Sequence, residues 1–159
     1  MDRLWAPWRI KYIRAKKHKR CIFCKGLKSK GKNYIIFKTK HSMSILNIFP
    51  YNNGHVMISP LRHIREISKL KECEILDLFH NLNNVKKLLD KVLKPDGYNI
   101  GLNISKEAGA GITGHLHIHL VPRWRGDTNF IPIISNTKII SQSLSELYKR
   151  LKHAKSKTD

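Results

Sequence analysis

The chain has 159 residues, 41% of them hydrophobic, and its 31 Lys and Arg against 11 Asp and Glu give a formal net charge of +20. This length suits one ordinary domain with a sizeable core, and no run of 18 apolar residues exists that would cross a membrane. A charge of this size indicates anionic partners such as nucleotides, nucleic acid or an acidic surface. A lysine-rich composition with a solvated surface explains part of it equally well.

The cysteine content argues against a disulfide scaffold, because the chain has three cysteines, an odd and low number. The opening residues, MDRLWAPWRI, lack the apolar stretch of a secretory signal, so we expect a cytoplasmic protein. Cys21 and Cys24 form a Cys-x-x-Cys pair, for which a redox pair, a metal site and coincidence all remain open. Cys73 falls in a helical pattern and is expected at the core or its boundary.

The first half of the chain predicts an arm followed by an antiparallel meander. Residues 1–20 combine aromatic anchors, Trp5 and Trp8, with a basic run, and residues 25–32 read as a loop rich in Gly and Lys. Pro50–Gly54 has the composition of a tight turn. The β-rich runs predict strands at Asn33–Lys40, Ser42–Phe49 and His55–Ser59.

The second half predicts one long helix, two strands and a C-terminal helix. Apolar residues recur every three or four positions through Leu70–Leu93, and Pro95 follows. The other predicted elements are strands at Tyr98–Ile104 and His115–Val121, a glycine-rich loop at 106–114, a helix at Ser143–His153 with Ser143 as N-cap, and a frayed basic tail at 154–159. The fold class is therefore α+β: a single domain over residues 1–159, with an antiparallel sheet of about five strands, one long helix and a C-terminal helix.

Three histidines alternate with aliphatic residues in the predicted strand His115–Val121 (HLHIHLV). On a strand, His115, His117 and His119 share one face while the aliphatic residues enter the core. A three-histidine metal face is one interpretation, although neighbours on one strand lie too far apart to reach one ion easily. The other is nucleophilic catalysis, in which a neutral imidazole attacks phosphorus and the preceding glycine-rich loop offers backbone N–H groups to phosphate oxygens.

The motif and its surroundings resemble the histidine triad superfamily, and within it the bacterial diadenosine tetraphosphate phosphorylase-like branch. The resemblance covers nearly the whole chain. It rests on HLHIHLV, on the LWAPWR opening, and on Leu46–His63 (LNIFPYNNGHVMISPLRH), Gly97–Asn103 (GYNIGLN), Glu107–Gly111 (EAGAG) and Val121–Ile133 (VPRWRGDTNFIPI).

The resemblance implies a nucleotidyl hydrolase or transferase that acts through a covalent nucleotidyl-histidine intermediate. His117, the middle histidine, would be the nucleophile, and His119 would contact phosphate or donate to the leaving oxygen. His115 would orient the site or bind a metal. Adenine nucleotides, including dinucleoside polyphosphates such as diadenosine tetraphosphate, are the implied substrates, with either phosphate or water resolving the intermediate.

The resemblance also implies nucleotide-binding residues around the triad. Asn47 takes the position of a ribose-binding residue, Asn103 that of a polar group near the phosphates, and His55 would buttress the triad. Many relatives carry polar side chains just before the triad, where this chain has Ala110–Thr113, so phosphate would rely on the backbone of Gly111 or on Thr113. The three tryptophans, Trp5, Trp8 and Trp124, would shape the pocket, an interface or the core.

Two further functions remain as alternatives. One is hydrolysis of adenosine phosphoramidate or aminoacyl-adenylates, as in another branch of the superfamily. The other is nucleic-acid binding or processing of adenylated DNA, which the charge supports but the lack of a recognisable nucleic-acid motif does not favour.

The resemblance finally implies a homodimer and a structural zinc ion. Relatives pair their long helix and one strand to form a continuous sheet across two subunits, and Tyr98–Asn103 is the candidate edge strand. Metal-containing relatives carry a histidine after the proline that matches Pro60, and use the first triad histidine as a ligand. The implied zinc ligands are therefore Cys21, Cys24, His63 and His115.

Overall fold

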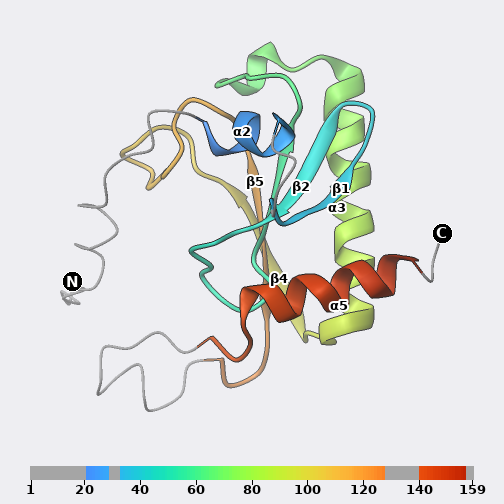
Figure 1. Ribbon diagram of the computed structural model, residues 1–159. Coiled ribbons are helices and arrows are strands. Elements are labelled where there is room, and N and C mark those ends of the chain that lie inside the picture. The colour runs from blue at the N-terminus through green and yellow to red at the C-terminus, as the bar shows by residue number, and fades with distance from the viewer. Residues whose placement is uncertain (1–20, 29–32, 128–139, 157–159) are drawn as a thin grey trace, which may run out of the picture.

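The computed structural model describes residues 21–28, 33–127 and 140–156. Its centre is an antiparallel five-stranded sheet (Figure 1). The strand order in this sheet is β1-β2-β3-β5-β4. The strands are β1 (Ile35–Lys38), β2 (Ser42–Leu46), β3 (Val56–Pro60), β4 (Gly97–Leu102) and β5 (Ile118–Arg123), and the main helices are α3 (Glu72–Leu93) and α5 (Leu144–Ser156). The predicted α+β fold is confirmed.

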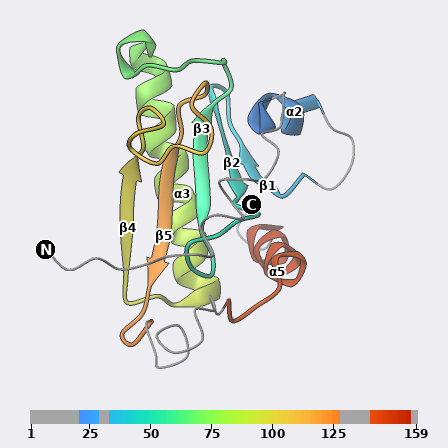
Figure 2. The same ribbon diagram turned by 90° about the vertical axis from the view of Figure 1, so that its left-hand side faces the viewer.

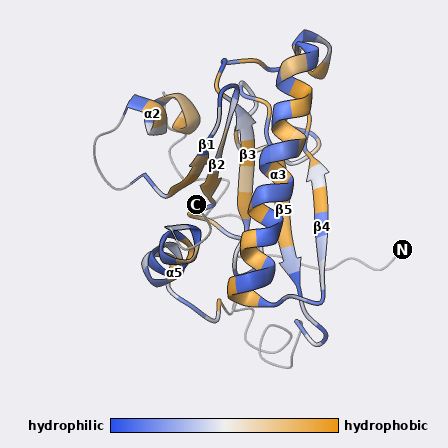
Figure 3. Cartoon of the chain, turned by 90° about the vertical axis from the view of Figure 1, so that its right-hand side faces the viewer, coloured by the Kyte–Doolittle hydropathy of each residue, from blue (hydrophilic) through white to orange (hydrophobic). Residues whose placement is uncertain are grey.

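The long helix α3 covers one face of the sheet, and α5 packs beside it against β1 (Figure 2). Hydrophobic and hydrophilic residues alternate along α3 (Figure 3), so that it buries one side and exposes the other. Lys94 ends the helix in a left-handed conformation, and Pro95 cannot continue it. The main core lies between α3, α5 and this face of the sheet, and it includes Val56, Ile58 and Leu120.

A second, smaller core lies on the opposite face, where the short helix α2 (Ile22–Lys28) covers β2 and β3. Phe23 from α2 is fully buried against Met43, Ile45 and Met57. Because helices cover both of their faces, β2 and β3 are buried along their whole length, unlike the edge strand β4.

A tight turn between β2 and β3 delivers His55 to the second face. Gly54 in this turn has φ of +75°, and a Cβ there would lie 2.6 Å from the Leu93 side chain. The turn therefore requires glycine for both its backbone and its close approach to α3.

Several sequence predictions need correction. The predicted loop at 25–32 is helical through Lys28, because α2 packs its apolar side on the sheet. Cys73 is exposed, since it lies on the outer side of α3. The tail predicted to fray at 154–159 is helical through Ser156, where Lys155 Nζ lies over the Phe37 ring at 4.4 Å and ties the last turn to β1.

Other predictions hold or stay open. The hydroxyl of Ser143 accepts a hydrogen bond from the Glu146 N–H, as expected of an N-cap. No helix among the described residues has the length and apolarity needed to cross a membrane. The arm at residues 1–20, with Trp5 and Trp8, lies outside the described residues, and the single domain over the whole chain stays a prediction.

Candidate active site and metal centre

The triad lies where the chain enters β5 on the face that α2 covers. The strand begins at Ile118 rather than at His115, so the first two histidines precede it. All three are nevertheless buried, and the rings of His117 and His119 meet edge to face at 4.8 Å. The expected common face is thus present, although it is built partly from irregular backbone.

One nitrogen of His117 is held by the protein and the other is left available. The Nδ1–H donates to the carbonyl oxygen of His115 at 2.9 Å, so a neutral ring carries its lone pair on Nε2. Burial lowers the pKa of His117, which favours this neutral form at physiological pH. The Phe23 ring packs against His117 with centroids 5.2 Å apart and fixes its orientation. These are the properties that an imidazole nucleophile needs.

Hydrogen bonds to backbone fix the proton of His119 through His55. The backbone N–H of Tyr51 donates to Nδ1 of His55 at 3.0 Å, so His55 carries its proton on Nε2. That proton is donated to Nδ1 of His119, 2.9 Å away, which leaves the His119 proton on Nε2. We call this chain, from Tyr51 through His55 to His119, the imidazole relay. Burial lowers the pKa of His119 to about 4, so that it is neutral above that pH.

The predicted nucleotide-binding residues fall into two groups. Asn47 and Asn103 border the relay. The amide nitrogen of Asn47 lies 3.3 Å from His55 Nδ1. The side-chain amide of Asn103 lies 3.4 Å from His119 Nε2, and with the His119 proton on that nitrogen the amide oxygen is the group that can accept it. Gly111 and Thr113 lie in the exposed loop that leads into the triad. Asn47 and Asn103 therefore meet the histidines directly, whereas Gly111 and Thr113 are exposed residues of the loop that precedes the triad.

The four predicted metal ligands come together in one cluster, which we call the Cys–His cluster. Its ligand atoms, from Cys21, Cys24, His63 and His115, all lie within 4.8 Å of one another. The Nδ1 atom of His115 is 3.3 Å from Cys21 Sγ and 3.8 Å from Cys24 Sγ, and His63 Nδ1 is 3.3 Å from Cys24 Sγ. Zinc–ligand bonds of roughly 2.0–2.3 Å in a tetrahedron place neighbouring ligand atoms about 3.5 Å apart, so the donor set and its spacing fit zinc.

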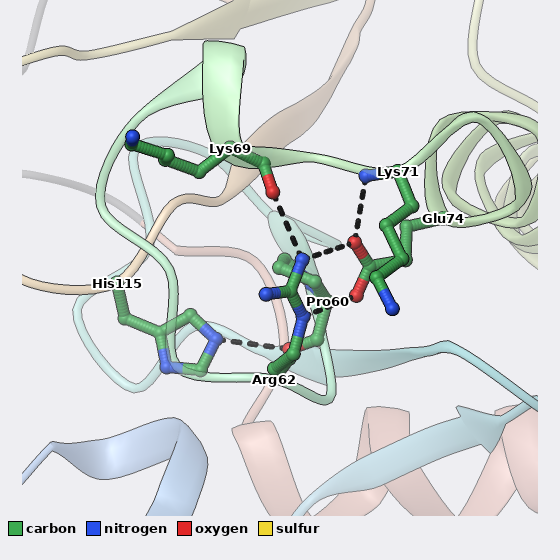
Figure 4. Close-up of polar contacts among 6 residues, drawn as sticks. All are labelled: Pro60, Arg62, Lys69, Lys71, Glu74 and His115. Carbon is green, nitrogen blue, oxygen red and sulfur yellow. Dashed lines mark hydrogen bonds and ion pairs between the residues drawn. The ribbon is translucent and has the colours of Figure 1, made fainter.

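The tautomer of His115 also suits metal binding. Its Nε2–H donates to the carbonyl oxygen of Pro60 at 2.9 Å (Figure 4), so the lone pair on Nδ1 faces the two sulfur atoms. Such a bond on the far nitrogen is the usual way in which proteins orient a ligating histidine. His115 therefore links the candidate nucleophile to the Cys–His cluster, since its carbonyl oxygen accepts the His117 Nδ1–H and its ring faces the cysteines.

Sequence reasoning missed several groups that shape the site. Phe23 packs on both His115 and His117, and its place between the two cysteines was the available signal. The Pro60 carbonyl and the Tyr51 N–H are backbone groups, which leave no mark in the residue types. The Tyr51 ring also lies over His55 at 4.5 Å. Trp124 directly follows β5 and is partly buried, and its role stays a prediction.

Comparisons with known proteins found related sequences. The sequence profile described as HIT domain matches residues 28–126. AP-4-A phosphorylase of Mycobacterium tuberculosis is 33% identical over 156 residues, which cover 92% of this chain and 80% of that protein. Adenosine 5′-monophosphoramidase of Saccharomyces cerevisiae is 33% identical over 103 residues, covering 65% of this chain and 62% of that protein.

Solved structures share the fold as well. The crystal structure of a Zn-bound histidine triad family protein from Mycobacterium smegmatis superposes with a TM-score of 0.70 at 23% identity. The superposition covers 87% of this chain and 95% of that one.

Proposed function

Because this chain belongs to the HIT domain family, we propose that it cleaves dinucleoside polyphosphates of the diadenosine tetraphosphate type through a nucleotidyl-His117 intermediate. The observation that carries the proposal is the geometry of His117, whose Nδ1–H is held by the His115 carbonyl while Nε2 keeps its lone pair. The similarity to AP-4-A phosphorylase over most of the chain supports the substrate class.

The reaction would proceed in two displacements at the α-phosphorus. Nε2 of His117 attacks, a P–N bond forms, and the bond to the leaving phosphate oxygen breaks. The ring then becomes a cation, which the His115 carbonyl stabilises because it accepts the Nδ1–H. Nε2–H of His119, set by the imidazole relay, donates a hydrogen bond to the developing phosphate charge.

The second displacement breaks the P–N bond and restores His117. With diadenosine tetraphosphate, ATP leaves in the first displacement. In the second, attack by water would release AMP, whereas attack by inorganic phosphate would release ADP. We favour phosphate, on the similarity to AP-4-A phosphorylase. Asn47 would bind the ribose. The phosphates would be bound by Asn103, Gly111 and Thr113.

The test is mass spectrometry of the protein quenched during turnover of diadenosine tetraphosphate, with and without phosphate. An AMP adduct on His117 is expected, and the products in phosphate should be ADP and ATP. Turnover without any adduct, or an adduct on another residue, would refute the covalent role of His117. AMP and ATP at every phosphate concentration would identify a hydrolase.

A second candidate substrate is adenosine phosphoramidate, which the similarity to the monophosphoramidase supports. The same first displacement would break a P–N bond of the substrate instead of a P–O bond. Comparing kcat/KM for the two substrates decides between them. Nucleic-acid binding, the alternative based on charge, predicts a steep loss of binding to DNA with rising salt.

The Cys–His cluster would hold one structural zinc ion, which supplies a crosslink between α2, the segment after β3 and the entry to β5. Its donor set and the Nδ1 lone pair of His115 support this assignment. Metal analysis of protein purified without added metal should give about one zinc per chain. Absence of metal in that protein would overturn the assignment.

We expect a homodimer that pairs through β4. This strand is at the edge of the sheet, and it exposes Ile100 and Leu102. Light scattering should give twice 18.5 kDa for the wild type and for Ile67→Lys, a control elsewhere on the surface, and the monomer mass for Ile100→Lys. A monomeric wild type at micromolar concentration would contradict the expectation.

A further inference from the structure

An ion pair ties the segment after β3 to the start of α3 (Figure 4). Both oxygens of Glu74 accept hydrogen bonds from Arg62, from Nε at 2.9 Å and from Nη2 at 2.7 Å. The same carboxylate accepts the N–H of Lys71 at 2.9 Å, and Arg62 Nη2 also donates to the Lys69 carbonyl at 2.9 Å. This two-pronged geometry fixes direction as well as distance, so it holds Arg62 firmly on the end of the helix.

The Glu74 carboxylate is unusual in being almost fully buried on a helix whose other acidic residues are more exposed. Its exposed fraction is 4%. The hydrogen bonds from Arg62 hold its pKa at about 2, so it is ionised throughout the range in which cysteine and histidine bind zinc. A buried carboxylate without a partner destabilises the fold. Conformations in which Glu74 loses its bonds to Arg62 are therefore disfavoured.

Arg62 lies in the middle of the segment 60–64, which has no regular structure beyond the end of β3. Three neighbours of Arg62 in this segment bond to a member of the Cys–His cluster or to the residue that follows His115. The Pro60 carbonyl holds the His115 ring, and His63 Nδ1 lies 3.3 Å from Cys24 Sγ. The Ile64 carbonyl accepts the N–H of Leu116 at 2.6 Å.

Both histidines of the Cys–His cluster therefore depend on where this segment lies. His63 belongs to it, and the ring of His115 takes its orientation from it. Backbone bonding anchors its start, because the Leu61 N–H donates to the His41 carbonyl at 2.8 Å. Arg62, the residue before His63, is anchored by its own side chain, which binds Glu74 at the start of α3.

We infer that Glu74, acting through Arg62, is a positioning residue for the metal site, because it holds segment 60–64 where His63 and His115 converge on the two cysteines. The inference rests on the proposed zinc site. Residues that orient ligands from outside the coordination shell commonly change metal affinity by about 10- to 100-fold when mutated. Glu74 would thereby connect the N-terminus of α3 with a site to which it contributes no ligand.

The test measures zinc affinity of the full chain by competition with a chromophoric chelator. Glu74→Gln keeps the size and one acceptor but loses the charge and the second prong, so zinc should bind roughly 10- to 100-fold more weakly. Asp90→Asn is the matched control, since Asp90 lies on the same helix and pairs with Lys86 and Tyr98 at 2.8 Å each. Its zinc affinity should equal that of the wild type.

A second variant and a second readout separate positioning from general stability. Arg62→Lys keeps a positive charge beside Glu74 but removes the paired hydrogen bonds from Nε and Nη2, and it too should weaken zinc binding. If Glu74→Gln does not fold, the zinc affinity of Arg62→Lys tests the positioning role by itself. The visible spectrum of bound Co²⁺ should change in both variants, because the angle of His63 to the metal changes.

The outcomes distinguish this inference from the zinc proposal. Wild-type zinc affinity in the Arg62 and Glu74 variants would overturn the positioning role and leave the zinc site standing. Equal weakening in Asp90→Asn would also overturn it, since general destabilisation would then be the cause. A wild-type protein that binds no zinc would overturn both.

Discussion

His117 lies between the imidazole relay and the Cys–His cluster, because its ring contacts that of His119 and its Nδ1–H donates to the His115 carbonyl, yet different forces fix the geometry of the two groups. The relay joins residues of two paired strands: Met57 is opposite His119, and His55 immediately precedes β3. Backbone pairing therefore sets its distances. The Cys–His cluster instead gathers side chains from α2, from the segment after β3 and from the entry to β5. Irregular segments of this kind are positioned by side-chain contacts and, on our proposal, by the ion itself.

The largest expected effect comes from removing the nucleophile, which both halves serve. His117→Ala should lower turnover by roughly four to six orders of magnitude, as for loss of other covalent nucleophiles, and leave the fold intact. His80→Ala, which removes an exposed histidine of α3, should keep full activity. Steady-state kinetics and circular dichroism check this. Substantial turnover by His117→Ala would show that another group attacks phosphorus.

Breaking the relay should have the next largest effect. His55→Phe keeps an aromatic ring at this position but removes the bond to His119, so the proton of His119 is no longer fixed on Nε2. We expect kcat to fall about 100-fold, within the usual range for lost acid–base and hydrogen-bonding groups. Val56→Ala, which trims the neighbouring core residue on the opposite face, is the control for lost stability. Equal losses in both variants would count against the relay.

Breaking the Cys–His cluster should affect stability more than chemistry. The double variant Cys21→Ser/Cys24→Ser should lose its zinc. At metal concentrations about 100-fold above Kd, it should also lose about 2.7 kcal/mol of stability, or roughly 5–10 °C in Tm. Cys73→Ser, at an exposed cysteine, should change neither. Thermal unfolding with parallel metal analysis measures both. An unchanged metal content in the double variant would assign the cysteines another purpose.

The smallest expected effect is the part of the pH dependence of stability that His119 of the relay contributes. The pKa of His119 is about 4 when folded and about 6.5 when unfolded, because burial disfavours its charged form. Between these values the unfolded chain binds the extra proton, so stability should decline as the pH falls from about 6.5 to about 4. We expect roughly 1–3 kcal/mol over this window. The free energy of unfolding, measured with denaturant at several pH values, should fall less steeply with falling pH in His119→Gln than in the wild type. An identical dependence on pH would exclude His119 as its source.

Patterns of residue type made much of the molecule predictable. The α3 periodicity predicted its C-terminal end correctly and its start within two residues, because an amphipathic helix shows its buried side in the sequence. Ser143 correctly predicted the start of α5, because serine is a typical N-cap residue. Prediction failed at 25–28, where glycine and lysines suggested a loop. A helix as short as α2 is unstable by itself, and packing on the sheet stabilises it. Cys73 was misplaced for a related reason: periodicity gives a helix but not the depth of each position.

The candidate site divides in the same way. The sequence by itself determined which groups are available: three alternating histidines, a pair of cysteines and a histidine after Pro60. Only the tertiary structure decided how they are joined. The Tyr51 N–H donates to His55, while the His115 and Pro60 carbonyls accept from His117 and His115, and these bonds select the protonated nitrogen of each of the three rings. Backbone groups are the same at every residue, so the sequence does not reveal them. Which ring nitrogen is free for chemistry or metal therefore follows from the fold, because the fold decides which backbone group each ring meets.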